Sequence, residues 1–174
     1  MSRARRLSLR TVVLLSLALA LAATAGNLLS AQGQKLPITW SAPSTAVRGT
    51  AGDFVAIDVS ARIDEGWHLY ALTQAPPPDP TVISVAAGQP FSLRPGGTIE
   101  APLPEKAFDA AVGVDTEFYT ESVTFKLPVA VEKTATPGDY KVIVTAKWQA
   151  CNGSLCLRPQ TTTIEVPVRV QPAK

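Results

Sequence analysis

The chain has 174 residues, of which 46% are hydrophobic and 6% aromatic, and its formal net charge at pH 7 is +2. Four of its 16 basic residues and none of its 14 acidic ones lie within residues 1–25. Without that segment the net charge is −2, which gives no electrostatic support for nucleic-acid binding. The remaining length is typical of one domain.

The N-terminus has the pattern of a secretory signal peptide, which we predict over residues 1–25. Four arginines precede an apolar run over residues 11–22, and the small residues Ala23-Thr24-Ala25 form a cleavage site. The apolar run is shorter than the roughly 20 residues that span a bilayer. We therefore expect a protein secreted to the periplasm, with no membrane segment after cleavage. A flexible leader is predicted over residues 26–36, and one domain over residues 37–174.

Short alternating segments separated by turn signals fill the rest of the chain. Residues 53–63 show the clearest alternation of apolar and polar side chains, which is typical of a half-buried strand. Prolines make residues 75–80 a surface loop or edge crossing, and residues 95–116 are predicted to be a long connection. Turns are predicted at residues 48–53, 64–66 and 136–139. Strands are predicted over residues 36–40, 53–63, 67–70, 81–85, 91–93, 123–131, 140–148 and 162–170.

No segment after residue 25 shows a convincing helical period. Seven or eight short strands separated by turns are typical of an antiparallel sandwich. The sequence therefore predicts an all-β protein with an immunoglobulin-like antiparallel β-sandwich.

Both cysteines lie between the last two predicted strands. Cys151 and Cys156 are separated by four residues that begin with an Asn-Gly pair, a strong signal for a tight turn. Chains leaving such a turn are close enough for a disulfide. We predict that the cysteines lie at the tip of a hairpin and pair with each other.

Two interpretations of this disulfide remain open at this point. In one, the chain is a non-enzymatic secreted interaction module and the bridge is purely structural. However, closing so short a loop contributes only about 2 kcal/mol in the loop-entropy model, against about 4.7 kcal/mol for a loop of roughly 100 residues. A domain of this size also folds without a disulfide. A redox role is therefore a second interpretation.

Three stretches together resemble the N-terminal periplasmic domain of the bacterial thiol:disulfide interchange protein DsbD. They are Gly66–Tyr70, Glu117–Tyr119 and Trp148–Pro159. The resemblance implies an immunoglobulin-like sandwich that passes reducing equivalents between periplasmic thioredoxin-fold proteins by transient mixed disulfides. It would act as a monomeric redox partner of the thiol:disulfide oxidoreductase type, without a cofactor.

The resemblance also implies roles for individual residues. Cys156 would form the mixed disulfide with a partner, and Cys151 would resolve it. Phe118 and Tyr119 would form a cap over the sulfurs that moves aside when a partner docks. A carboxylate such as Glu117 would raise the pKa of a nearby thiol and discourage indiscriminate attack. Two further side chains are expected to support the pair, namely His68 and Tyr70.

The chain departs from the family pattern in four respects. The best-known members place five residues between the cysteines, where this chain has four. Thr116 stands where an acidic residue is usual, and His68 stands where a tyrosine is usual. The chain ends at Lys174 without the membrane-spanning conduit and thioredoxin-like domain that follow in the family, so we expect its reductant to be a separate protein.

Other roles for these residues remain alternatives. In the alternative to a cap, Phe118 and Tyr119 are core residues at the start of the strand that follows. A metal-handling module that uses both sulfurs and His68 is a third interpretation. Those three donors fall short of the four that a structural zinc site requires, so no metal site is predicted.

Overall fold

The computed structural model describes residues 35–173, and this part of the chain contains strands but no helix. The predicted signal peptide and nearly all of the predicted leader lie outside the described residues. No helix in the described part is long and apolar enough to cross a membrane. The strands are β1 (Ile38–Ser41), β2 (Val47–Thr50), β3 (Phe54–Ile63), β4 (Trp67–Tyr70), β5 (Val82–Val85), β6 (Phe91–Leu93), β7 (Glu105–Asp109), β8 (Val114–Tyr119), β9 (Ser122–Val131), β10 (Gly138–Trp148), β11 (Ala150–Asn152) and β12 (Gln160–Gln171).

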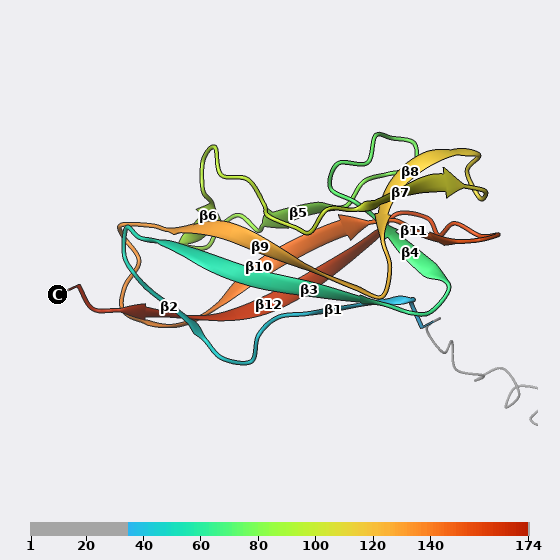
Figure 1. Ribbon diagram of the computed structural model, residues 1–174. Helices are drawn as coiled ribbons and strands as arrows, with labels where there is room; N and C mark the ends of the chain where they lie inside the picture. The colour runs from blue at the N-terminus through green and yellow to red at the C-terminus, as the bar shows by residue number, and fades with distance from the viewer. Residues whose placement is uncertain (1–34, 174) are drawn as a thin grey trace, which may run out of the picture. The chain divides into compact units, whose positions relative to one another are not determined.

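The strands form three four-stranded sheets (Figure 1). The first sheet has the order β1-β3-β9-β6 and the second has the order β2-β12-β10-β5. These two sheets are the layers of a sandwich. The third sheet, with the order β11-β4-β8-β7, lies at one end of the sandwich, and we call it the terminal sheet. The fold confirms the predicted all-β, immunoglobulin-like sandwich.

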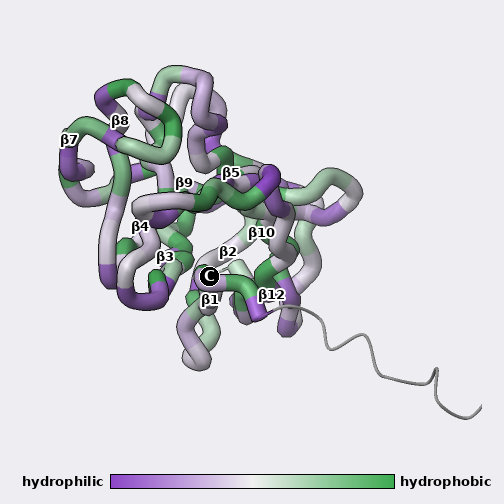
Figure 2. The backbone as a smooth tube through the Cα atoms, turned by 90° about the vertical axis from the view of Figure 1, so that its right-hand side faces the viewer, coloured by the Kyte–Doolittle hydropathy of each residue, from purple (hydrophilic) through white to green (hydrophobic). Residues whose placement is uncertain are grey.

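The alternation of side chains explains why these strands share one core. In β3, every second residue from Val55 to Ile63 is buried, and β9 pairs with it in an antiparallel register that places Ile57 opposite Leu127. Figure 2 shows hydrophobic and hydrophilic residues alternating along the chain. Phe125 of β9 anchors the core, because its ring stacks on Trp40 and meets the edge of Tyr119. The buried faces of the two main sheets thus form one hydrophobic cluster.

The predicted hairpin between residues 140–148 and 162–170 is confirmed. β10 and β12 pair antiparallel over their whole length, from Gly138 opposite Val170 to Trp148 opposite Gln160. The indole of Trp148 is buried and donates a hydrogen bond to the hydroxyl of Thr162 at 3.0 Å. This long hairpin carries the cysteine segment to the terminal sheet.

Two predicted connections are wrong in part. Residues 48–53 were expected to be a turn, but Val47–Thr50 forms β2, which pairs in parallel with β12. Only the residues from Thr50 to Asp53 make the turn. Residues 95–116 were expected to be a long connection, but their second half forms β7 and the start of β8. Four of the five residues of β7 are exposed. Buried and exposed residues therefore do not alternate along this edge strand, and the sequence does not predict it.

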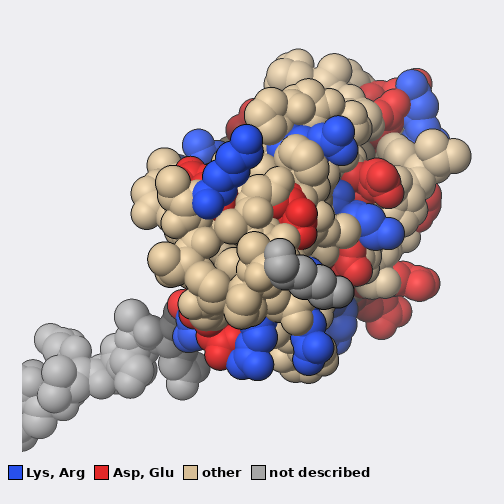
Figure 3. Space-filling model, turned by 90° about the vertical axis from the view of Figure 1, so that its left-hand side faces the viewer, with Lys and Arg blue, Asp and Glu red and all other residues tan. Residues whose placement is uncertain are grey.

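Charged side chains of both signs are interspersed on the face shown in Figure 3. The one bidentate ion pair among the described residues joins Arg169 of β12 to Asp139 of β10, and both partners are exposed. Exposed pairs of this kind contribute at most about 1 kcal/mol to stability. The burial of the core, and not the surface charge, therefore holds this fold together.

Gly49 provides a test of how tightly β2 packs on the core. A Cβ atom at Gly49 would lie 2.5 Å from the Cγ1 atom of Val55. Overpacking of this kind costs about 1–3 kcal/mol, so Gly49→Ala is expected to lower the free energy of unfolding by that amount in urea denaturation. At Gly138 the nearest atom would be 3.9 Å away, and the control Gly138→Ala should change stability by less than about 0.5 kcal/mol. Equal effects of the two variants would contradict the packing argument.

Candidate functional site

The two cysteines form a disulfide at the edge of the terminal sheet. Cys151 lies on β11 and stands opposite His68 of β4, and its sulfur is bonded to that of Cys156. The turn between them is organised by Asn152, whose side-chain oxygen accepts hydrogen bonds from the backbone N–H groups of Ser154 and Leu155 at 3.0 and 2.8 Å. The predicted pairing of the cysteines is therefore confirmed.

A tight turn forms at the Asn-Gly pair, since Cys151 pairs antiparallel with Cys156 and the N–H of Asn152 donates to the carbonyl of Leu155 at 2.9 Å. It differs from the prediction in its backbone and in the strands that it joins. Gly153 is not among the glycines with positive φ, and β10 and β12 are not joined directly through it. Instead, the chain leaves β10, adds β11 to β4, and returns through Cys156 before β12 begins. This excursion brings the sulfurs to the terminal sheet.

The two cysteines differ in their burial. Cys151 is completely buried, whereas Cys156 is half-buried and follows the exposed side chain of Leu155. Cys156 is therefore the less buried residue of the pair.

The register of the terminal sheet decides which side chains meet the disulfide. His68 stands opposite Cys151, Tyr70 opposite Phe118, and Asp109 opposite Val114. Residues opposite each other share a face, and so do residues two apart on one strand. One face, which we call the site face, therefore carries Cys151, His68, Tyr70, Phe118, Thr116 and Asp109.

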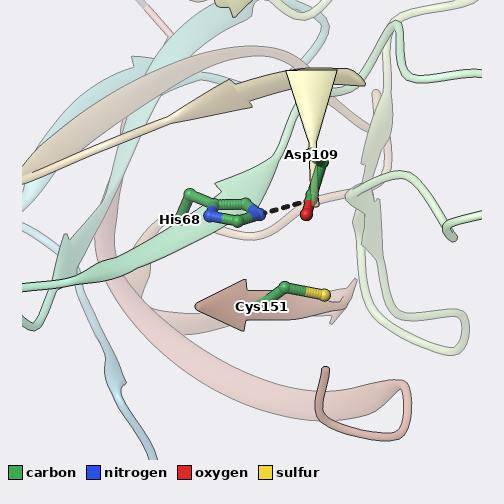
Figure 4. A group of neighbouring side chains, drawn as sticks. All are labelled: His68, Asp109 and Cys151. Atoms are coloured by element: carbon green, nitrogen blue, oxygen red, sulfur yellow. Dashed lines mark hydrogen bonds and ion pairs between the residues drawn. The ribbon is translucent and has the colours of Figure 1, made fainter. Parts of the chain in front are cut away.

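A buried carboxylate lies at the centre of the site face. The Oδ2 atom of Asp109 accepts hydrogen bonds from the hydroxyl of Tyr70 at 2.7 Å and from the Nε2 atom of His68 at 2.8 Å. The same hydroxyl lies 2.8 Å from the sulfur of Cys151. Figure 4 shows His68 pointing toward Asp109, with Cys151 beside them. The disulfide is thus connected, through the hydroxyl of Tyr70, to the carboxylate of Asp109, which also contacts His68.

The protonation states follow from these contacts. Burial raises the pKa of Asp109, but hydrogen bonds from Tyr70, from the N–H of Ala111 and from His68 outweigh it and hold the pKa below its usual range. Burial and the neighbouring carboxylate raise the pKa of the Tyr70 hydroxyl far above its ordinary value. Asp109 is therefore ionised and Tyr70 neutral at physiological pH, and since a carboxylate only accepts, the Nε2 atom of His68 carries the donated proton.

The lowered pKa of Asp109 determines the direction in which the stability of the fold changes with pH. Because the folded-state pKa of Asp109 lies below its unfolded value, its contribution to stability is present at neutral pH. That contribution is lost as the pH falls through the lowered pKa. The hydrogen bonds to Asp109 therefore stabilise the fold at neutral and mildly acidic pH.

The structure separates the two aromatic residues expected to cap the sulfurs. Phe118 lies on the site face, where its ring packs 4.7 Å from that of His68. Tyr119 is the next residue and therefore points to the opposite face. It is buried in the core against Phe125, and its hydroxyl donates to the carbonyl of Pro102. Of the two residues, Phe118 alone shares a face of the terminal sheet with His68 and Cys151.

The structure also separates Glu117 from the sulfurs. Glu117 shares the face of Tyr119, where its carboxylate accepts a hydrogen bond from the hydroxyl of Thr73 at 2.5 Å and lies 3.6 Å from the Nζ atom of Lys106. The carboxylate near the disulfide is that of Asp109. Sequence reasoning missed Asp109 because it ends β7 in the stretch expected to be a connection. The one local signal was the turn from Asp109 to Gly113, which has the residues of a hairpin loop.

Comparison with known proteins identifies the family. The profile of the family described as "Thiol:disulfide interchange protein DsbD, N-terminal" matches residues 38–167. The chain belongs to the DsbD N-terminal domain family. A search of curated proteins found no match.

The solved structures that resemble the chain include two bacterial N-terminal domains. The DsbD N-terminal domain of Neisseria meningitidis, in the reduced form, is 16% identical, with 82% of this chain and 99% of that chain covered and a TM-score of 0.48. The N-terminal periplasmic domain of ScsB from Proteus mirabilis is 15% identical, with 81% of this chain and 49% of that chain covered and a TM-score of 0.51. The chain thus spans about half the length of the ScsB structure, and this likeness is one of fold. As a DsbD N-terminal domain with a formed Cys151–Cys156 disulfide, the chain is a thiol–disulfide exchange module.

Proposed function

We propose that this domain passes reducing equivalents between thioredoxin-fold proteins of the periplasm through the Cys151–Cys156 pair. The observation that carries the proposal is the asymmetry of the disulfide. Cys156 is half-buried, while Cys151 is completely buried, with the hydroxyl of Tyr70 at 2.8 Å from its sulfur. A purely structural bridge has no need of this arrangement.

The exchange proceeds in two balanced steps. The thiolate of a reduced partner attacks the sulfur of Cys156, so that a mixed disulfide forms and the Cys151–Cys156 bond breaks. Cys151 leaves as a thiolate and then takes up a proton. The second thiol of the partner, as its thiolate, attacks the mixed disulfide and releases Cys156. Two electrons have then passed to this domain, and the reverse sequence hands them to an oxidised acceptor.

Tyr70 assists the departure of Cys151 in this scheme. Its hydroxyl lies 2.8 Å from the sulfur and carries a proton at physiological pH. A hydrogen bond to a charged acceptor is about twice as strong as one between neutral groups. The donor therefore gains strength as negative charge develops on the sulfur, which lowers the barrier to opening the disulfide.

Phe118 is proposed to act as a lid that keeps small reagents away from the reduced sulfurs. Its ring stands opposite Tyr70 in the sheet and packs on His68. A partner that docks on Cys156 would displace the ring and so open the site only within a complex. The reduced pair would then be slow toward small disulfides and fast toward its partners.

Removing the lid should make the reduced pair less selective. Phe118→Ala is expected to raise the rate of reaction with a small disulfide, such as oxidised glutathione, by about 3- to 10-fold, because the ring no longer restricts access. Thiol loss measured by alkylation and mass spectrometry gives this rate. The exposed ring of Phe108 on the opposite face of the sheet provides the control, and Phe108→Ala should leave the rate unchanged. An unchanged rate in Phe118→Ala would remove the lid from the proposal.

The periplasmic location of the exchange rests on two observations of different kinds. Residues 1–25 have the pattern of a signal peptide, and the ScsB domain of similar fold is named as periplasmic. An oxidising compartment also favours a disulfide between two cysteines.

Redox equilibration with glutathione tests the proposed function. Structural disulfides have reduction potentials below about −300 mV and resist the glutathione pool. We expect the Cys151–Cys156 pair to equilibrate with mixtures of reduced and oxidised glutathione, with the two states separated by alkylation. If the bridge remains fully oxidised throughout the accessible range, the alternative of a secreted interaction module with a structural disulfide is correct.

A further inference from the structure

The disulfide belongs to a cluster of metal-ligating side chains. One donor atom each from His68, Asp109 and Cys151 lies within 4.8 Å of the others. They come from β4, β7 and β11, and Figure 4 shows His68 directed at Asp109 with Cys151 beside them. The side chains of His68 and Asp109 are only 14% and 2% exposed, and Cys151 is completely buried. A nitrogen, an oxygen and a sulfur donor therefore lie close together on side chains that are shielded from water.

A fourth donor becomes available when the disulfide is reduced. Cys156 is bonded to Cys151, so its sulfur is next to the cluster once the bond opens. Metal ligation by cysteine requires the thiolate, which neither residue can offer while they are bonded to each other. The sequence alone provided three donors, and Asp109 completes the four that a tetrahedral site requires.

We propose that reduction of the disulfide creates a binding site for one zinc-like divalent cation, held by Cys151, Cys156, His68 and Asp109. Two thiolates, one imidazole and one carboxylate form a mixed set that suits a borderline-soft cation. Magnesium and calcium prefer oxygen ligands throughout and are not suited to this set. The oxidised domain lacks the two thiolates and does not bind the ion. The proposal requires only that the bridge can be reduced.

The geometry requires small movements of side chains. Ligands at roughly 2.0–2.3 Å from a common zinc ion lie about 3.3–3.8 Å from one another, so donor atoms now as far apart as 4.8 Å have to close by about 1 Å. Asp109 is oriented for this role, because its other oxygen, Oδ1, accepts a hydrogen bond from the N–H of Ala111 at 2.9 Å. The hydroxyl of Tyr70 lies between Asp109 and Cys151 and has to give up both contacts.

The binding reaction balances in two stages. A reduced dithiol partner transfers two electrons and two protons to the disulfide, becomes oxidised itself, and leaves two thiols on this domain. The cation then displaces the two thiol protons. The proton on Nε2 of His68 is released to solvent and Nδ1 carries the ring proton, so that Nε2 turns to the ion in place of its hydrogen bond to Asp109. While the cation is bound, both sulfurs are occupied and exchange is blocked.

Zinc titration of the reduced domain tests the proposal. The protein is reduced with a phosphine, freed of reductant without oxygen, checked for two free thiols, and titrated with Zn²⁺ against a chromophoric chelator. We expect one ion per reduced chain and none per oxidised chain. His68→Gln and Asp109→Asn, which keep the size of each side chain, should each weaken binding at least 10-fold, because each removes one of four ligands.

Two further variants separate this proposal from the exchange function. Glu117→Gln removes a carboxylate on the opposite face of the sheet and should leave zinc affinity unchanged. Tyr70→Phe keeps all four ligands, so it should retain zinc binding while exchange slows. Zinc binding that is absent, or equally strong without His68 and Asp109, overturns the metal site alone. A bridge that the phosphine does not open, shown by the thiol count, overturns both the metal site and the exchange function.

Discussion

A Cys151→Ser variant is expected to accumulate as a mixed disulfide with thioredoxin-fold proteins, whereas a Cys156→Ser variant should form none. Cys156 is half-buried, whereas Cys151 is completely buried. With Cys151 replaced, this domain has no second thiol to resolve the complex, so only the partner's own second thiol can open the covalent adduct and its lifetime increases. Non-reducing electrophoresis of a periplasmic extract, followed by mass spectrometry of the shifted bands, gives the measurement and identifies the partners.

The two variants serve as controls for each other, because each retains a single cysteine of the same pair. Equal adduct formation by both variants would mean that the burial of Cys151 does not direct the reaction with partners to Cys156. The separate roles of the two cysteines would then be wrong. Adducts through Cys151 alone would reverse the roles. If neither variant forms an adduct with any thioredoxin-fold protein, the bridge braces the turn and the domain does not exchange disulfides.

The sandwich could be predicted from the sequence because its strands have one buried and one exposed face. The run from Val55 to Ile63 and the run from Val123 to Val131 alternate with a period of two, and both are long strands of the core. Period-two alternation reports burial on one side directly. β7 has no such pattern, since almost all of it is exposed at the edge of the terminal sheet. A strand without a buried face does not require apolar and polar residues to alternate, so it cannot be predicted from that pattern.

The site was harder to predict, because it depends on register between distant segments. Sequence reasoning identified the disulfide, His68, Tyr70 and Phe118, which all lie on the site face. It could not separate Phe118 from Tyr119, because neighbours on a strand point to opposite faces and only the pairing with β4 shows which face meets the sulfurs. The same one-residue step turns Glu117 away.

Asp109→Asn is expected to speed the opening of the disulfide by a small thiol about 10- to 100-fold. Cys151 leaves as an anion, and the carboxylate of Asp109 lies within 4.8 Å of its sulfur. At an effective dielectric constant of about 20, two unit charges at that separation repel by about 3 kcal/mol, part of which is present in the transition state. The carboxylate also competes for the single proton of Tyr70, which the neutral amide would leave to the sulfur. Reduction by glutathione, followed by alkylation at timed intervals, gives the rate.

Glu117→Gln is the matched control, since it removes an equal charge two strands from Cys151 on the opposite face of the same sheet. Its rate should equal that of the unaltered domain. The comparison decides between two arrangements that the sequence could not distinguish, because the resemblance to the family pointed to Glu117 and the register points to Asp109. A faster rate in Glu117→Gln alone would restore the first arrangement. A slower rate in Asp109→Asn would show that the carboxylate promotes the departure of Cys151, most simply by positioning Tyr70 and His68, and that charge repulsion at the sulfur is the weaker effect.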